Sequence, residues 1–266
     1  MGGDRILKIN SKIIFVLVFA YGICLSIVES KMQLSQNESN LFYFLGVVLL
    51  IILLSPYIVD LLRFQRKYAS ILPILQDEKD PARFIQELEK ILEKINNTKI
   101  RNLYIMSLAA GYCENGDYNK AHQLLSSVNP KDLLAINQVI YYINMFAITL
   151  NLGDEEKALT ILEEKKTLIK QYEKHPSIES AITVNMAYGY LAKKDIDKAK
   201  YYLDKAEKLC HIPYLIDIIE YLKADIMVNE NCYDEARVVL ERLKEKKLTP
   251  SLIRKITKLE ASLEVK

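Results

Sequence analysis

A six-residue pattern that recurs four times in the second part of the chain constrains its fold more than any other feature. The copies begin at Gly116, Gly153, Lys194 and Asn231, and they read GDYNKA, GDEEKA, KDIDKA and NCYDEA. Their final alanines lie 37, 41 and 37 residues apart. Self-similarity at a period of about 20–50 residues is typical of repeat architectures, in which similar units stack on one another. We therefore expect a stack of units and not one closed core.

Each copy fits a tight turn that is followed by the start of a helix. Gly or Asn at the first position favours the left-handed conformation that ends a helix. An Asp in the next position can cap the following helix by accepting a backbone N–H. The small final alanine lets two helices approach closely. The matching contact positions lie twelve residues earlier and four residues later: Ala109, Phe146, Ala187 and Ala224, and Leu125, Leu162, Leu203 and Leu240.

The spacing of apolar residues predicts helix throughout residues 68–266, because they recur three and four positions apart. Prolines mark the remaining joins between helical hairpins: Pro130, Pro176, Pro213 and Pro250. A degenerate fifth copy of the pattern ends at Ala82, and a final helix over 251–264 is expected to cap the stack. The predicted fold class is therefore all-α.

This pattern resembles the tetratricopeptide repeat (TPR) over residues 100–247. The best copy has Leu108-Ala109-Ala110-Gly111-Tyr112 before the turn and Ala121 after it. Two features depart from the family: the periods exceed its length of about 34 residues, and Phe146 stands where a small residue is usual. The resemblance implies a TPR-like α-solenoid of four to five helical hairpins.

The N-terminal quarter contains two long uncharged runs, at residues 13–28 and 41–59. A helix needs about 20 apolar residues to cross a bilayer. We therefore predict two transmembrane helices, at about 12–30 and 41–62, with a short outside loop at 29–40. The alternative is that both runs form buried core helices of a soluble protein.

Basic residues flank the two runs on one side. Residues 1–12 contain Arg5, Lys8 and Lys12, and Arg63, Arg66 and Lys67 follow the second run. The positive-inside rule then places both termini in the cytoplasm. These features predict an integral membrane protein with an anchor at 1–67 and a cytoplasmic repeat domain at 68–266. Abundant Lys, Ile, Asn and Tyr are typical of an AT-rich bacterium, which would make this its plasma membrane.

The sequence gives no residue on which to place catalysis. It has no phosphate-binding glycine loop, no zinc-protease motif and no nucleophile elbow. His122, His175 and His211 have no partners at metal-ligand spacing. The net charge of +2 offers no electrostatic case for nucleic acid. We therefore expect a protein that is not an enzyme, with no cofactor, no metal, no catalytic residue, no nucleic-acid partner and no small-molecule substrate.

The resemblance implies a concave groove lined by the first helix of each hairpin. Its lining would be largely apolar with aromatic hydroxyls, and Asn144 and Asn185 at its edge could hold a peptide backbone. The lining positions are Met106, Ala110, Ile143, Asn144, Ala147, Val184, Asn185, Tyr188, Tyr221 and Asp225. The alternative is that these residues are core, buried by superhelical packing or by the ends of the chain itself.

These features favour a membrane-tethered scaffold or adaptor that presents its groove to a peptide or helical partner. One alternative is a regulatory protein that responds to a short peptide. Another is a subunit of an envelope assembly or secretion complex.

Overall fold

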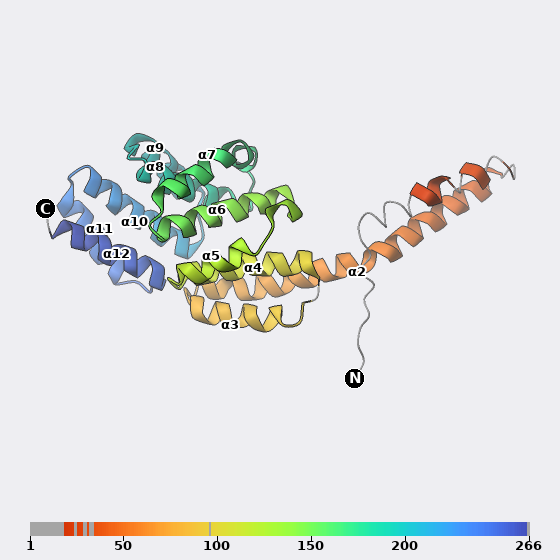
Figure 1. Ribbon diagram of the computed structural model, residues 1–266, viewed down its shortest axis with the longest axis horizontal. Coiled ribbons are helices and arrows are strands. Elements are labelled where there is room, and N and C mark those ends of the chain that lie inside the picture. Colours follow the sequence, from red (N-terminus) through yellow and green to blue (C-terminus); the bar gives the residue numbers. More distant parts are fainter. Residues whose placement is uncertain (1–18, 24–25, 29–30, 32–34, 96, 265–266) are drawn as a thin grey trace. The chain divides into compact units, whose positions relative to one another are not determined.

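The computed structural model describes residues 19–23, 26–28, 31, 35–95 and 97–264 (Figure 1). Within these ranges all regular secondary structure is helical, which confirms the predicted all-α class. The chain divides into two compact units, Met1–Lys67 and Tyr68–Lys266. The division falls inside one long helix, α2 (Gln36–Gln76).

The first unit contains a helical segment at residues 19–23 and the first part of α2. Ser35 starts α2, because its backbone N–H and its hydroxyl both donate to the Glu38 carboxylate, at 2.8 and 2.7 Å. The Tyr21 hydroxyl donates to the Phe42 carbonyl oxygen at 2.5 Å. A Cβ atom at Gly46 would overlap the Tyr21 ring, so this glycine permits the close approach of the two segments.

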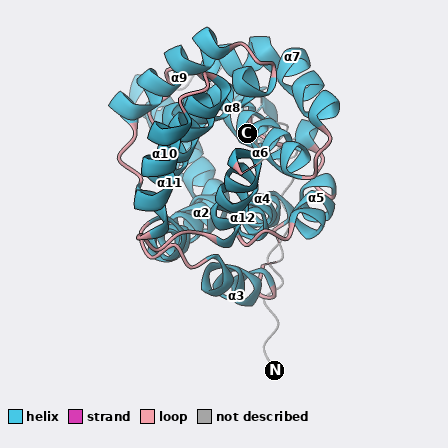
Figure 2. Cartoon of the chain, turned by 90° about the vertical axis from the view of Figure 1, so that its left-hand side faces the viewer, coloured by secondary structure: helices cyan, strands magenta, loops and turns pink. Residues whose placement is uncertain are grey.

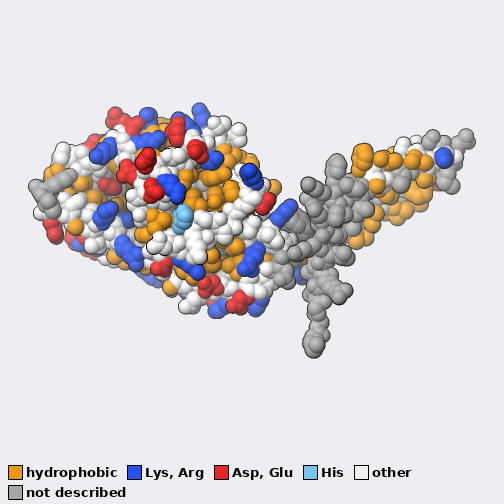
Figure 3. All heavy atoms as spheres, viewed as in Figure 1, with side chains coloured by type: hydrophobic (Ala, Val, Ile, Leu, Met, Phe, Trp, Pro, Cys, Tyr) orange, Lys and Arg blue, Asp and Glu red, His pale blue; other side chains and the backbone are white. Residues whose placement is uncertain are grey.

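Large apolar side chains are exposed along this part of α2, and Phe44 keeps 64% of its surface accessible (Figure 3). Nevertheless, no helix among the described residues is both long and apolar enough to cross a membrane.

This finding overturns the predicted integral membrane location and its two transmembrane helices. Most of the first predicted span, 12–30, lies outside the described residues. The second lies within α2, which begins at Gln36, inside the predicted outside loop of 29–40. The orientation assigned to the termini depended on these spans and is withdrawn with them.

The second unit is a succession of helices that pack in sequence order. Its helices are α3 (Pro81–Leu92), α4 (Thr98–Glu114), α5 (Tyr118–Ser126), the short 3-10 helix η1 (Pro130–Asp132), α6 (Ala135–Asn151), α7 (Glu155–Tyr172), α8 (Glu179–Ala192), α9 (Ile196–Leu209), α10 (Pro213–Asn229), α11 (Tyr233–Lys244) and α12 (Pro250–Leu263). The closest pairs form the hairpins α4–α5, α6–α7, α8–α9 and α10–α11. This arrangement is consistent with a helical solenoid.

The repeated turns have the predicted conformation. The first residue of each copy is left-handed, with φ of 83°, 87°, 58° and 65° at Gly116, Gly153, Lys194 and Asn231. Asp154 and Asp195 cap the next helices by accepting the backbone N–H groups of Lys157 and Lys198, at 3.2 and 3.3 Å. Asp117, in contrast, makes no capping hydrogen bond. The left-handed residue therefore separates the helices of each hairpin as expected, even where it is Lys, whereas the predicted cap forms at Asp154 and Asp195 only.

The predicted contacts between paired helices are confirmed. The four alanines that end the pattern have no accessible surface: Ala121, Ala158, Ala199 and Ala236. The large Phe146 is also fully buried, and Gly189 of α8 lies beside it. A Cβ atom at Gly189 would lie only 2.5 Å from Leu162 Cδ1 but 3.7 Å from the Phe146 ring, which is an ordinary contact, so the missing side chain on α8 makes room for Leu162 of α7.

The turn before α3 corrects the position of the fifth copy. Lys79 is left-handed at φ 52°, and Asp80 caps α3 by accepting the Arg83 N–H at 3.0 Å. The residue four positions after this cap is the buried Phe84, whereas Ala82 is exposed. The copy therefore ends two residues later than predicted, at Phe84. The small residue of this pair is Gly111 on the facing helix, where an added Cβ atom would lie only 2.9 Å from Phe84 Cδ1.

The last helix does more than cap the stack. Helix α12 begins at Pro250, one residue before the predicted start, and it contacts α4 and α10 as well as α11. Figure 2 shows α12 near the centre of the second unit, with the helices of the hairpins around it. A buried ion pair between Lys79 and Asp217 of α10 also joins the two ends of the helical array.

Candidate binding groove

The first helices of three hairpins, α4, α6 and α8, enclose a cavity of about 120 Å³ together with α10. One apolar side is formed by Phe146 of α6 and by Leu215 and Ile218 of α10. A cavity of roughly 150 Å³ can hold one benzene molecule. The closed part of this space therefore accommodates about one large side chain.

The structure brings most of the predicted groove residues to this cavity. Those that line it are Ala110 of α4, Ile143, Asn144 and Ala147 of α6, and Val184, Asn185 and Tyr188 of α8. The other three lie outside the lining. Met106 is 3% exposed and belongs to the core between α4 and α6, and Tyr221 and Asp225 lie farther along α10.

The lining residues differ in how accessible they are. Ile143 and Val184 are buried core residues, with 4% and 2% of their surface exposed. Ala110, Asn144, Ala147 and Asn185 are only partly buried. The groove is thus apolar core at its base, and its accessible wall consists of small and amide side chains.

Three asparagines line the cavity from α6 and α8. The side-chain amides of Asn151 and Asn185 donate to the carbonyl oxygens of Ala147 and Ala181, each at 2.8 Å. Within the described part of the chain, the side-chain oxygens of both residues accept no hydrogen bond, and the Asn144 side chain makes none. These groups can therefore accept hydrogen bonds from a backbone or side chain that enters the cavity.

A partly buried carboxylate, Glu114, and a lysine, Lys255, both line this space. Glu114, the last residue of α4, accepts a hydrogen bond from the Thr249 hydroxyl at 2.9 Å. Burial raises the pKa of Glu114, and the Lys255 ammonium and the Thr249 hydrogen bond offset part of that rise. Lys255 of α12 donates to the Tyr188 hydroxyl at 3.0 Å, and its Nζ lies 4.7 Å from the centre of the Tyr188 ring.

A second carboxylate lies next to the same lysine. Burial raises the pKa of Asp225 to about 6, although a hydrogen bond from Tyr221 and the charges of Lys255 and Lys258 act in the opposite direction. Tyr188 and Tyr221 lie side by side, with ring centres 6.5 Å apart. The groove helices therefore combine aromatic surface with two partly buried carboxylates.

The cavity lining includes a cysteine whose thiol is not activated. Cys113 lines the cavity, but burial raises the pKa of its thiol to about 12, so the thiol stays protonated at neutral pH. In the described ranges, no group of three or more His, Cys, Asp or Glu side chains could hold a metal ion. What the cavity offers is hydrogen bonding, apolar contact and one carboxylate beside one lysine.

Sequence analysis missed two of the polar residues, Glu114 and Lys255. Glu114 gave one signal, because an acidic residue at the C-terminus of a helix opposes the helix dipole and needs another reason to be there. Lys255 gave no such signal, since it lies in a helix whose charged residues resemble an ordinary solvated face.

In comparisons with known proteins, no family model, no curated protein and no solved structure matches this chain.

Proposed function

We propose that this chain is a protein-interaction module, a scaffold or adaptor whose TPR-like groove binds a helical or peptide segment of a partner protein. One observation supports this proposal above all others. The groove side of the hairpins already holds a helix, because α12 contacts both α4 and α10 and reaches Tyr188 of α8. A surface that packs one amphipathic helix has the shape and chemistry to pack another.

The accessible wall of the groove supports the same function. Small residues such as Ala110 and Ala147 allow a backbone to approach closely, and the apolar base supplies the buried area from which most binding energy comes. Asn144 and Asn185 add hydrogen-bonding groups that fix the orientation of the bound segment. The proposal requires no catalytic group.

The test uses two substitutions of the same kind at different places in the full chain. Ala147→Phe fills the cavity wall, whereas Ala82→Phe places the same ring on the exposed face of α3. Each protein is cross-linked in its native host, and the partners captured are compared quantitatively by mass spectrometry. We expect a partner that is recovered with wild type and Ala82→Phe but reduced at least tenfold with Ala147→Phe. Equal recovery by all three proteins would contradict the groove as the binding site.

A peptide-responsive regulator is the second candidate, and the free side-chain oxygens of Asn151 and Asn185 favour it. Acceptors in a row along a groove suit the N–H groups of an extended peptide. Calorimetry with extended and helix-forming peptides of matched composition separates the two candidates. Binding of the extended form alone favours the regulator, and binding of the helical form favours the scaffold.

A further inference from the structure

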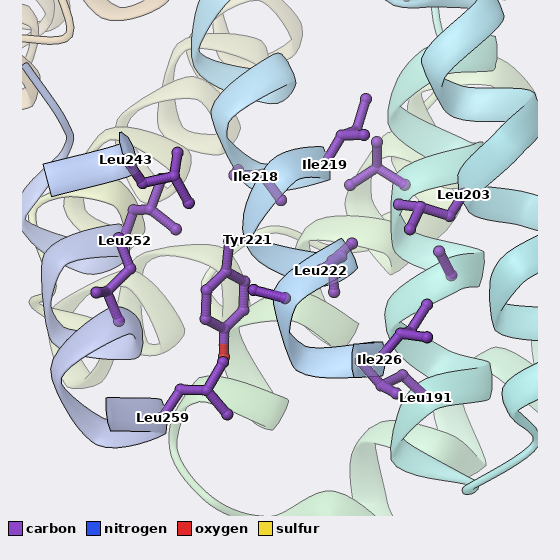
Figure 4. Close-up of a cluster of buried hydrophobic side chains, with 14 of the residues drawn as sticks. Leu191, Leu203, Ile218, Ile219, Tyr221, Leu222, Ile226, Leu243, Leu252 and Leu259 are labelled. Atoms are coloured by element: carbon purple, nitrogen blue, oxygen red, sulfur yellow. The ribbon is translucent and has the colours of Figure 1, made fainter. Parts of the chain in front are cut away.

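Helix α12 occupies the groove through a continuous apolar stripe. Leu252, Ile256, Leu259 and Leu263 recur at spacings of four, three and four, and each is at most 9% exposed. Leu252 and Leu259 face Tyr221 of α10 (Figure 4). The opposite face of the helix is polar and open to solvent, with Ile253 half exposed. This is the pattern of an amphipathic helix that lies in a hydrophobic groove.

The polar contacts of α12 reach the far end of the helical array. Near the α4–α5 turn, the Arg254 Nη1 atom donates to the Gly116 carbonyl oxygen at 2.6 Å, and the Ser251 and Tyr118 hydroxyls lie 3.1 Å apart. The Thr249 hydroxyl binds Glu114 in the same region. These contacts join α12 to the α4–α5 hairpin, while an ion pair between Lys244 and Glu260 at 2.8 Å joins it to α11.

The charges of α12 complement those of the groove. Arg254, Lys255 and Lys258 lie on α12, whereas Glu114 and Asp225 are carboxylates on the groove helices. If α12 left without a replacement, two partly buried carboxylates would lose nearby positive charges. The charges of the groove helices therefore favour a cationic occupant.

The fit of α12 is incomplete. The cavity is lined mainly by α6 and α8, and Lys255 is the residue of α12 that borders it. A helix that also filled this cavity would bury more apolar surface than α12 does. That additional burial is what a partner needs to compete with an occupant on the same chain, whose effective concentration is high.

We infer that α12 is an intramolecular occupant of the groove, and that the partner is a basic amphipathic helix that takes its place. This inference rests on the proposed function and adds the chemistry of the partner and a mechanism of control. The groove is closed while α12 is bound, and a partner with a stronger apolar face and matching basic residues opens it.

The test places a charge on either face of α12 in the full chain. Ile256→Asp disrupts the buried face, whereas Ile253→Asp puts the same charge on the exposed face of the same helix. The probe is a fluorescent synthetic peptide of residues 249–264, and its binding is measured by anisotropy. We expect the peptide to bind Ile256→Asp at least tenfold more tightly than it binds wild type or Ile253→Asp. Equal affinity for the three proteins would overturn the inference.

The basic character is tested with a peptide in which Arg254, Lys255 and Lys258 are replaced by Glu. We expect at least a tenfold loss of affinity for Ile256→Asp, and an unchanged affinity would overturn the basic-helix assignment. Because Ile256→Asp can also unfold the chain, native-state hydrogen exchange of wild type provides an independent measurement. We expect the amides of α12 to exchange while those of α6 and α8 stay protected. Exchange of all three helices in one global event would overturn the inference.

The two proposals fail in different ways. If the peptide does not bind Ile256→Asp, but Ala147→Phe still abolishes partner capture, the inference about α12 is wrong and the groove function stands. If Ala147→Phe has no effect on capture, the proposed function is wrong, whatever the peptide does.

Discussion

Gly116 and Gly153 have equivalent places in two copies of the repeated turn but differ in their surroundings, and this difference yields a quantitative prediction. Their φ angles are 83° and 87°. An added Cβ atom would meet nothing within 4 Å at Gly153, but at Gly116 it would lie 2.5 Å from Arg254 Nη1 of α12. Substitution by alanine therefore imposes the same backbone strain at both sites and an additional collision only at Gly116.

The expected magnitudes follow from these geometries. A left-handed alanine costs about 1–2 kcal/mol, and the lower entropy of its unfolded chain offsets about 0.4–1 kcal/mol. We therefore expect Gly153→Ala to lower the free energy of unfolding by about 1 kcal/mol. Gly116→Ala also displaces the Arg254 guanidinium from the Gly116 carbonyl oxygen. Because Arg254 is exposed, losing that hydrogen bond adds only about 1 kcal/mol to the cost. Gly116→Ala should therefore lower the free energy of unfolding by about 2 kcal/mol in total.

The assay is urea unfolding of the full chain, followed by circular dichroism at 222 nm. The control is the Arg254→Ala background, in which Gly116→Ala should cost only about 1 kcal/mol, as Gly153→Ala does. The reasoning is refuted if both glycine variants cost the same in the wild-type background. It is equally refuted if the excess at Gly116 persists without Arg254.

Two further predictions concern charged groups. Asp217 is 3% exposed and pairs with Lys79 and Lys246. Asp217→Ala should therefore lower the free energy of unfolding by about 2–3 kcal/mol, whereas Lys246→Met, at the more exposed partner, should lower it by under about 1 kcal/mol. Equal losses in urea unfolding would contradict a buried pair. The pKa of Asp225 rises from 3.8 to about 6, so between pH 4 and 6 the folded state holds a proton that the unfolded state has released. The free energy of unfolding should therefore fall as the pH rises through this range, and Asp225→Asn should reduce the slope; an unchanged slope would show that this carboxyl is not responsible.

The sequence predicted the repeated hairpins because their signals are local. A left-handed residue, a capping Asp and a small alanine act within one turn, so Gly153, Asp154 and Ala158 can be recognised without knowing what packs on them. The fifth copy was misplaced because Lys79 provides the left-handed turn and Phe84 occupies the alanine position, so neither residue type indicates the turn.

The predicted membrane spans were wrong for a different reason. Counting uncharged residues measured the length of two runs in the sequence, whereas no helix among the described residues is both long and apolar enough to cross a membrane. Likewise, Glu114 and Lys255 lie 141 positions apart in the sequence, and no local pattern connects them.

The sequence by itself determined the helices, their turns and the pairing of each hairpin, because these depend on interactions between residues close together in the chain. Only the tertiary structure decided what fills the groove. The path of a stack depends on small rotations between successive hairpins, which accumulate over the whole unit. That accumulated curvature is what brings Thr249 and Arg254 to Glu114 and Gly116, and so places α12 in the groove.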